Sequence, residues 1–155
     1  MNNKTTIFEN SDNPVFNFSL VPRQWQLCFC SDCPQHEQCL RYLAGQHVPD
    51  NLTWGPAVYP TAATRADCQH FKVTRVIRAA YGFEPLFRDV KHSDLMPLRQ
   101  KIERYLGSHG TYYNYQHGRR LLTPEQQNWI LALFKRYGYA DNLSFQHYVN
   151  VIDFS

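Results

Sequence analysis

The sequence predicts a small α+β protein, a single compact domain with a loop-rich, cysteine-rich N-terminal half and a mostly helical C-terminal half. The length of 155 residues is that of one ordinary domain. The composition, 43% apolar and 15% aromatic with 19% charged residues, supports a core and excludes a disordered chain. We expect three parts: a polar tail over 1–13, a Cys-rich metal-binding module over 14–71, and a basic, mainly helical module over 72–155, the two modules packed as one domain.

The N-terminal half carries few regular elements. Alternating apolar side chains over 15–20 predict a short strand, which Pro22 ends. A helical turn is expected over 37–43, ending near Gly45. The proline-rich stretch over 48–62 reads as an ordered loop whose aromatic side chains pack on the core.

The C-terminal half is more regular. The type of the element over 72–80 stays open, since its spacing suits a helix or a buried strand. Ser93 is positioned to cap a helix that runs to Leu106, and Gly107 suits the residue after its end. The alternating aromatic residues over 112–116 predict a strand or extended segment.

The strongest local signal lies near the end of the chain. Thr123 suits an N-cap, Pro124 the first helical position, and Gln126 the third, from which its side chain can reach back in a capping box. The helix should stop at Gly138, and a last short helix is expected from Ser144.

Cysteines are the most distinctive feature of the sequence. Four of them fall within residues 28–39, and the fifth precedes a histidine in the pattern Cys68-x-His70. No signal peptide is visible, so we expect reduced thiols in the cytoplasm rather than disulfides. Thiolates at such short spacing can hold zinc tetrahedrally; an iron–sulfur cluster is the alternative. Spacing leaves the four ligands open: the set Cys28, Cys33, Cys39 and Cys68 is one option, Cys30 rivals Cys28, and His36 and His70 are further candidates.

A metal with four protein ligands has no open coordination position, so we expect a structural rather than a catalytic ion. The ion would fasten segments that are far apart in sequence. The sequence contains no phosphate-binding glycine loop, no H-E-x-x-H and no G-x-S-x-G. We therefore assign no catalytic residue.

Positive charge is concentrated in the middle of the chain. Residues 71–120 carry 10 Lys or Arg against 4 Asp or Glu, a net +6, whereas the whole chain has +3. The segment 111–120 combines three tyrosines with two arginines, and such a mixture can stack on bases and pair with phosphates. The residues predicted to bind RNA or single-stranded DNA are Arg75, Arg78, Tyr113, Tyr115, Arg119 and Arg120.

Several blocks of this sequence resemble a family of small uncharacterised proteins, a domain of unknown function, from gut bacteria of the Bacteroides group. The blocks are Phe16 to Pro22, Cys33-Pro34 to Cys39-Leu40-Arg41, Cys68 with Phe71, Thr111-Tyr112-Tyr113 through Gly118, Arg120-Leu121-Leu122, and Pro124-Glu125-Gln126. The resemblance implies a ligand set of Cys28, Cys33, Cys39 and Cys68, from which Cys30 departs. It implies no reaction.

These observations predict a zinc-stabilised, cytoplasmic, non-enzymatic module with a regulatory role that binds nucleic acid or a nucleoprotein. The alternative is a protein–protein interaction adaptor that binds no nucleic acid. No apolar run reaches the roughly 18 residues of a membrane-spanning helix, so we expect no membrane partner.

Overall fold

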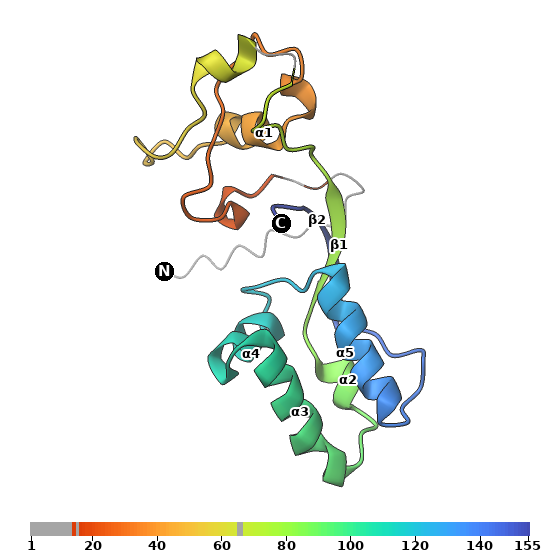
Figure 1. The fold of residues 1–155 in the computed structure, drawn as a ribbon. Coiled ribbons are helices and arrows are strands. Elements are labelled where there is room, and N and C mark those ends of the chain that lie inside the picture. Colours follow the sequence, from red (N-terminus) through yellow and green to blue (C-terminus); the bar gives the residue numbers. More distant parts are fainter. Residues whose placement is uncertain (1–13, 15, 65–66) are drawn as a thin grey trace. The chain divides into compact units, whose positions relative to one another are not determined.

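A computed structural model describes residues 14, 16–64 and 67–155 of the chain (Figure 1). They divide into two compact units. The Cys-rich unit comprises the described residues up to Val76 together with Val151–Ser155, and the helical unit comprises Ile77–Asn150. The first division between the units falls after Val76, where the sequence suggested one after residue 71, and the last five residues belong to the Cys-rich unit.

The fold class is α+β, as predicted. A two-stranded antiparallel sheet pairs β1 (Val76–Tyr81) with β2 (His147–Ile152). The described α-helices are α1 (Leu40–Gln46), α2 (Glu84–Phe87), α3 (His92–Leu106), α4 (His109–Gln116) and α5 (Pro124–Arg136). Short 3₁₀ turns cover Phe18–Leu20, His36–Gln38 and Pro60–Thr64.

The helical unit has a continuous hydrophobic core. Phe83 and Phe134, both almost fully buried, lie in it with apolar side chains from α3, α4 and α5. The ring of Phe83 stacks on Tyr112 with centroids 4.6 Å apart. The core comprises Ala80, Phe83, Leu86, Leu98, Ile102, Tyr112, Tyr115, Leu122, Ile130, Leu133, Phe134 and Phe145.

The Cys-rich unit buries much less. Its buried apolar side chains are Leu27, Cys39, Leu40, Ala44, Val151 and Ile152, and none of them is aromatic. Its only described α-helix is the seven-residue α1. A unit of this size with so few large buried side chains gains little from hydrophobic burial, which is the situation in which small domains use metals or disulfides.

The capping box at the start of α5 is confirmed. The Thr123 hydroxyl accepts from the backbone N–H of Gln126 (3.3 Å), and the Gln126 side chain accepts from the backbone N–H of Thr123 (3.0 Å). The helix ends at Arg136, shortly before Gly138, whose φ of 85° suits glycine.

We expect replacement of Thr123 with alanine to lower the free energy of unfolding of the helical unit by about 1 kcal/mol, because the backbone N–H of Gln126 loses the hydroxyl that accepts from it. Urea unfolding followed by circular dichroism measures this. Ser144→Ala, at an exposed position in the same unit, should leave the midpoint unchanged. Equal midpoints for the two variants would contradict the assigned role of the cap.

The prediction of an extended segment over 112–116 was wrong, because these residues form the helix α4. Ser108 caps this helix by accepting from the backbone N–H of Thr111 at 3.1 Å. The alternation of tyrosines suggested a strand, but Tyr112 and Tyr115 lie three residues apart on one helical face and are both buried. Tertiary packing of that face outweighs the strand preference of the aromatic residues.

The C-terminal helix expected from Ser144 was also wrong, because β2 occupies this part of the chain. Its register is visible in the bond from Gln146 N to Gly82 O at 3.0 Å and in that from Asp153 N to Arg75 O at 2.9 Å. The open alternative over 72–80 is settled in favour of a strand for its second part, since β1 begins at Val76.

Two further local predictions need correction. Ser93 does not cap α3, which begins at His92 with Lys91 in the N-cap position. The expected strand over 15–20 is replaced by the 3₁₀ turn Phe18–Leu20, which Asn17 caps by accepting from the backbone N–H of Ser19. Residue 15 lies outside the described residues.

Within the described part of the chain, no helix has the length and apolarity needed to cross a membrane.

Candidate metal centre

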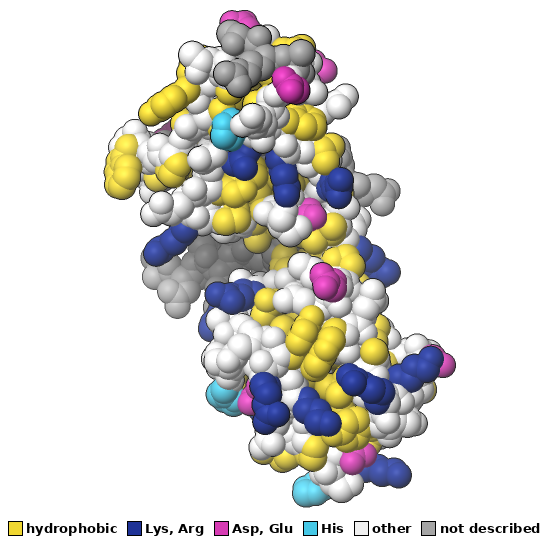
Figure 2. Space-filling view, in the orientation of Figure 1, with side chains coloured by type: hydrophobic (Ala, Val, Ile, Leu, Met, Phe, Trp, Pro, Cys, Tyr) yellow, Lys and Arg dark blue, Asp and Glu magenta, His cyan; other side chains and the backbone are white. Residues whose placement is uncertain are grey.

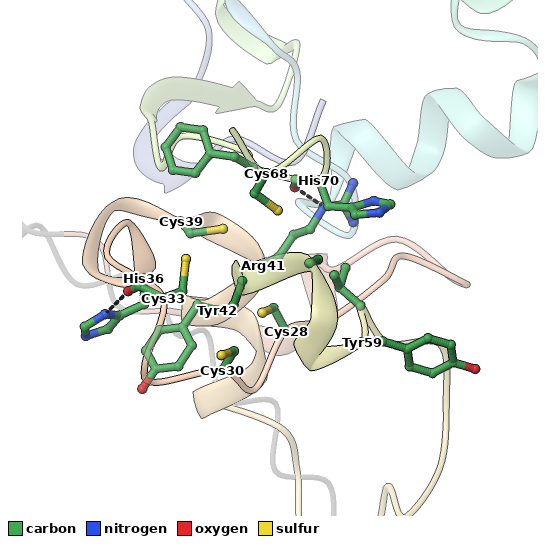
Figure 3. Close-up of a pocket in the computed structure, with 14 residues that line it drawn as sticks. Cys28, Cys30, Cys33, His36, Cys39, Arg41, Tyr42, Tyr59, Cys68 and His70 are labelled. Atoms are coloured by element: carbon green, nitrogen blue, oxygen red, sulfur yellow. Dashed lines mark hydrogen bonds between the residues drawn. The ribbon is translucent and has the colours of Figure 1, made fainter. Parts of the chain in front are cut away.

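All five cysteine side chains line one pocket of the Cys-rich unit (Figure 3). All are free thiols; Cys39 is buried and the other four are half-buried. The sulfur atoms of Cys28, Cys33, Cys39 and Cys68 point into this pocket, and Cys30 lies at the opposite end of it from Cys68 in this view. The structure thus brings together a cysteine 29 residues beyond Cys39 with the four of the N-terminal cluster.

Cys28 is held by its backbone against α1. Its N–H donates to the carbonyl of Arg41 (3.0 Å). The helix residue Gly45 lies so close that a Cβ built there would stand 2.2 Å from the Cys28 carbonyl oxygen. Leu27, the residue before Cys28, forms a parallel bridge with Ala57, which fixes the backbone leading into Cys28.

Cys33 and Cys39 flank a tight turn. The Cys33 carbonyl accepts from the N–H of His36 (3.1 Å), which starts the 3₁₀ turn that leads into Cys39. Cys39 is the N-cap residue of α1 and pairs with Val73 in an antiparallel bridge. That bridge, with the bond from Leu40 N to Lys72 O (2.6 Å), anchors the segment that follows Cys68.

Cys68 begins a second tight turn, closed by the bond from Phe71 N to Cys68 O at 3.1 Å. The guanidinium of Arg41 ties this turn to the first segment, because it donates to the carbonyl of His70 (2.7 Å) and to that of Gln26 (2.8 Å). Sequence reasoning missed this role of Arg41. The only signal for it was its place in the Cys39-Leu40-Arg41 block.

The side chains of His36 and His70, the two alternative ligands, are not directed at the cysteine sulfur atoms (Figure 3). The His36 ring bonds through Nδ1 to the carbonyl of Cys33 (2.7 Å) and packs edge-on against Tyr42. In Figure 3 the rings of His36 and His70 both point away from the sulfur atoms. Neither imidazole is directed at the thiols in this view.

The surroundings of Cys28 disfavour its ionised form. Burial raises the pKa of the Cys28 thiol, and the charges of Cys39, Cys30 and Cys33 raise it further, while a backbone hydrogen bond from Cys30 opposes the shift. As the side chains stand, no three His, Cys, Asp or Glu residues among those described are arranged to share an ion. A divalent cation would offset the repulsion between the Cys28 thiolate and its neighbours.

The residues predicted to bind nucleic acid are distributed over both units. Arg75 belongs to the Cys-rich unit, and the other five belong to the helical unit. Tyr115 is only 8% exposed and lies in the core, which leaves its ring no free face for a base. Tyr113 is 41% exposed, and its ring stacks parallel to that of His117.

The remaining arginines of this set are exposed. The backbone N–H groups of Arg119 and Arg120 both bond to the carbonyl of Asn114, which places them directly after α4. The guanidinium of Arg78 lies 4.1 Å from the ring centroid of Tyr148. The helical unit holds 10 Lys or Arg against 6 Asp or Glu, a net charge of +4, and Figure 2 shows several of these cations on the face that carries α3.

Residues 3–154 match the family of unknown function DUF6078. No curated protein and no solved structure gave a significant match. The family description carries no activity, ligand or source organism, so the expected Bacteroides-group origin stays a prediction. The match spans almost the whole chain, both the Cys-rich and the helical unit, and the chain therefore belongs to the DUF6078 family of unknown function.

Proposed function

We propose that Cys28, Cys33, Cys39 and Cys68 hold one structural zinc ion that stabilises the Cys-rich unit in a reducing cytoplasm. The observation that carries this proposal is the convergence of cysteines from separate segments on one pocket. Free cysteines without a shared role usually lie singly among apolar neighbours. Four thiolates meet the tetrahedral preference of zinc without leaving a position for substrate.

Because the Cys-rich unit has a small hydrophobic core, a bound ion would add to its stability. Turns at Cys33 and Cys68 and the start of α1 at Cys39 are held mainly by backbone hydrogen bonds. An ion bound to all three joins them directly, and its binding free energy becomes part of the stability of the unit. Cys30 remains as a fifth thiol in the pocket, outside the proposed set.

Elemental analysis of protein purified without added metal tests the proposal. We expect about one zinc per chain and a colourless protein. A brown protein with iron and inorganic sulfide would establish the iron–sulfur alternative instead. Fully folded, metal-free protein whose unfolding midpoint does not respond to added zinc would overturn the metal centre.

For the partner, we propose that the helical unit binds single-stranded nucleic acid or a nucleoprotein, in a regulatory rather than an enzymatic role. The charge of +4 on this unit and the exposure of Arg119, Arg120 and Tyr113 support this. The buried Tyr115 is left out of the surface, and so is Arg75, which lies in the other unit. A protein-interaction adaptor is the second candidate, favoured by the exposed aromatic side chains.

A salt titration separates the two candidates. We expect affinity for single-stranded RNA to fall steeply with salt, and the slope of log affinity against log salt to decrease by about 1.4 in the double variant Arg119→Gln, Arg120→Gln, since each lost phosphate contact on a single strand removes about 0.7.

The matched control removes the same charge elsewhere in the helical unit, as Arg88→Gln with Arg136→Gln, both at exposed positions. This control should retain nearly the whole slope. No binding of RNA or single-stranded DNA at low salt would remove the nucleic-acid function, and equal losses in the two double variants would show non-specific attraction only.

A further inference from the structure

A second cavity in the Cys-rich unit has no cysteine in its lining. Its volume is about 590 Å³, within the range of small-molecule sites in proteins. It shares no lining residue with the thiol pocket. The apolar part of its wall comprises Phe18, Val21, Pro22, Trp25, Leu27, Phe29, Val48, Leu52, Trp54 and Pro56.

One segment separates the two pockets. Along residues 27–30, Leu27 and Phe29 line the cavity, whereas Cys28 and Cys30 line the thiol pocket. Such alternation is that of an extended chain, whose successive side chains point to opposite faces. The cavity is therefore built by the same backbone that presents the proposed metal ligands, on its other side.

Large apolar side chains of this cavity are left in contact with solvent. Trp54 is 86% exposed, Phe29 56% and Leu52 43%. In Figure 1 the loop after α1, which carries Leu52 and Trp54, extends away from the helix, and Figure 2 shows apolar side chains on the surface of this unit. Contiguous exposed apolar surface around a concavity marks a binding site more often than a structural wall.

The cavity has a single charged lining residue, Arg23. It lies in a turn closed by the bond from Trp25 N to Pro22 O at 3.1 Å. The next residue, Gln24, has a φ of 64° and is the one non-glycine residue with positive φ among the residues that the structure describes. Backbone held in this disfavoured region is enriched at ligand sites.

We propose that this cavity binds a small apolar carboxylic acid, whose hydrocarbon part packs between Trp54, Phe29 and Trp25 and whose carboxylate pairs with the Arg23 guanidinium. The apolar walls stabilise the bound hydrocarbon by removing it from water. The Arg23 guanidinium makes binding of an anionic head group more favourable than binding of a neutral one. Arginine suits this role because its donors match the two oxygens of a carboxylate.

The experiment titrates the zinc-loaded protein, as purified, with 1-naphthoate and with decanoate, and follows tryptophan fluorescence. The neutral 1-naphthamide serves as the uncharged comparison. We expect saturable binding of at least one of the two acids and about tenfold weaker binding of the amide. Arg23→Gln should weaken binding of the acid about tenfold and leave binding of the amide unchanged.

Trp54→Ala should weaken acid and amide alike, because it removes an apolar wall. Arg75→Gln, an exposed arginine of the same unit outside the cavity, is the control and should change neither affinity. Near-ultraviolet circular dichroism and zinc content report whether each variant keeps its fold, so a failure of the metal centre is distinguished from a failure of this site.

Absence of binding of both acids by folded protein would overturn the proposal. Equal affinity for acid and amide, with no effect of Arg23→Gln, would remove the anion preference. A Trp54-dependent dimer that binds neither acid would identify a second copy of the chain as the occupant instead.

Discussion

Replacing Cys33 with serine should release the zinc and unfold the Cys-rich unit. A serine hydroxyl does not ionise near neutral pH, so one of four ligands is lost. Structural zinc supplies roughly 10–16 kcal/mol of apparent binding free energy in small domains. A typical domain is stable by only about 5–15 kcal/mol in total, so the small core around Leu40 and Ala44 cannot replace the ion. Cys33 is a cleaner position than Cys39, which is also buried in the core.

Cys30→Ser is the matched control, since Cys30 lies in the same pocket but outside the proposed ligand set. It should keep about one zinc per chain and an unchanged unfolding midpoint. Zinc content by elemental analysis and limited proteolysis of the two variants measure the difference. Loss of zinc from Cys30→Ser with retention in Cys33→Ser would show that the ligand set is wrong.

The helical unit should survive the loss of zinc. Its core is formed by α3, α4, α5 and the residues around β1, all within Ile77–Asn150, and includes no cysteine. We expect proteolysis of metal-free protein to remove the Cys-rich unit first and to leave hydrogen-exchange protection in α5. Simultaneous loss of both units would contradict this division.

One local signal of the sequence predicted local structure correctly. The start of α5 follows from Thr123, Pro124 and Gln126 alone, because a capping box satisfies backbone donors within one turn of chain. The secondary structure of the segment after Ser144 could not be predicted from such a local signal. Its apolar residues suit either element, and its pairing with β1 depends on a partner some 70 residues away in sequence.

The tyrosines of α4 show a related limit. Tyr113 and Tyr115 lie two residues apart, as on one face of a strand, but in the helix Tyr112 and Tyr115 are buried on one face and Tyr113 is exposed on another. Which face a helix buries is decided by the surface it packs on, here Phe83. Tyr115, which was predicted to stack on bases, is therefore part of the hydrophobic core instead.

The cysteine cluster could be recognised in the sequence because thiols at short spacing are chemically specific. The residues that position the cysteines could not be recognised, since their roles depend on contacts between segments that are distant in sequence. Arg41 bonds two carbonyls that lie 44 residues apart in sequence, those of Gln26 and His70. Gly45 was expected only as the end of a helix, whereas the structure places it inside α1 against the backbone of Cys28.

Replacing Gly45 with alanine should therefore destabilise the Cys-rich unit, opposite to the usual effect of this change in a helix. Alanine favours a helix over glycine by about 1 kcal/mol, so at an open position of α1 it would stabilise. At Gly45 the new methyl group would stand 2.2 Å from the carbonyl oxygen of Cys28, which is backbone and cannot turn aside. Forced separation of the two segments should cost about 3 kcal/mol or more and displace Cys28 from the ion.

Chemical unfolding of the zinc-loaded variant measures the loss of stability, and competition with a chelator measures the weakened zinc affinity. Gly55→Ala is the matched control, because a Cβ there would meet no atom within 4 Å. That control should change the free energy of unfolding by less than about 0.5 kcal/mol. A Gly45→Ala protein as stable as the parent, with unchanged zinc affinity, would mean that α1 does not press on Cys28 and that the proposed ligand is positioned by other contacts.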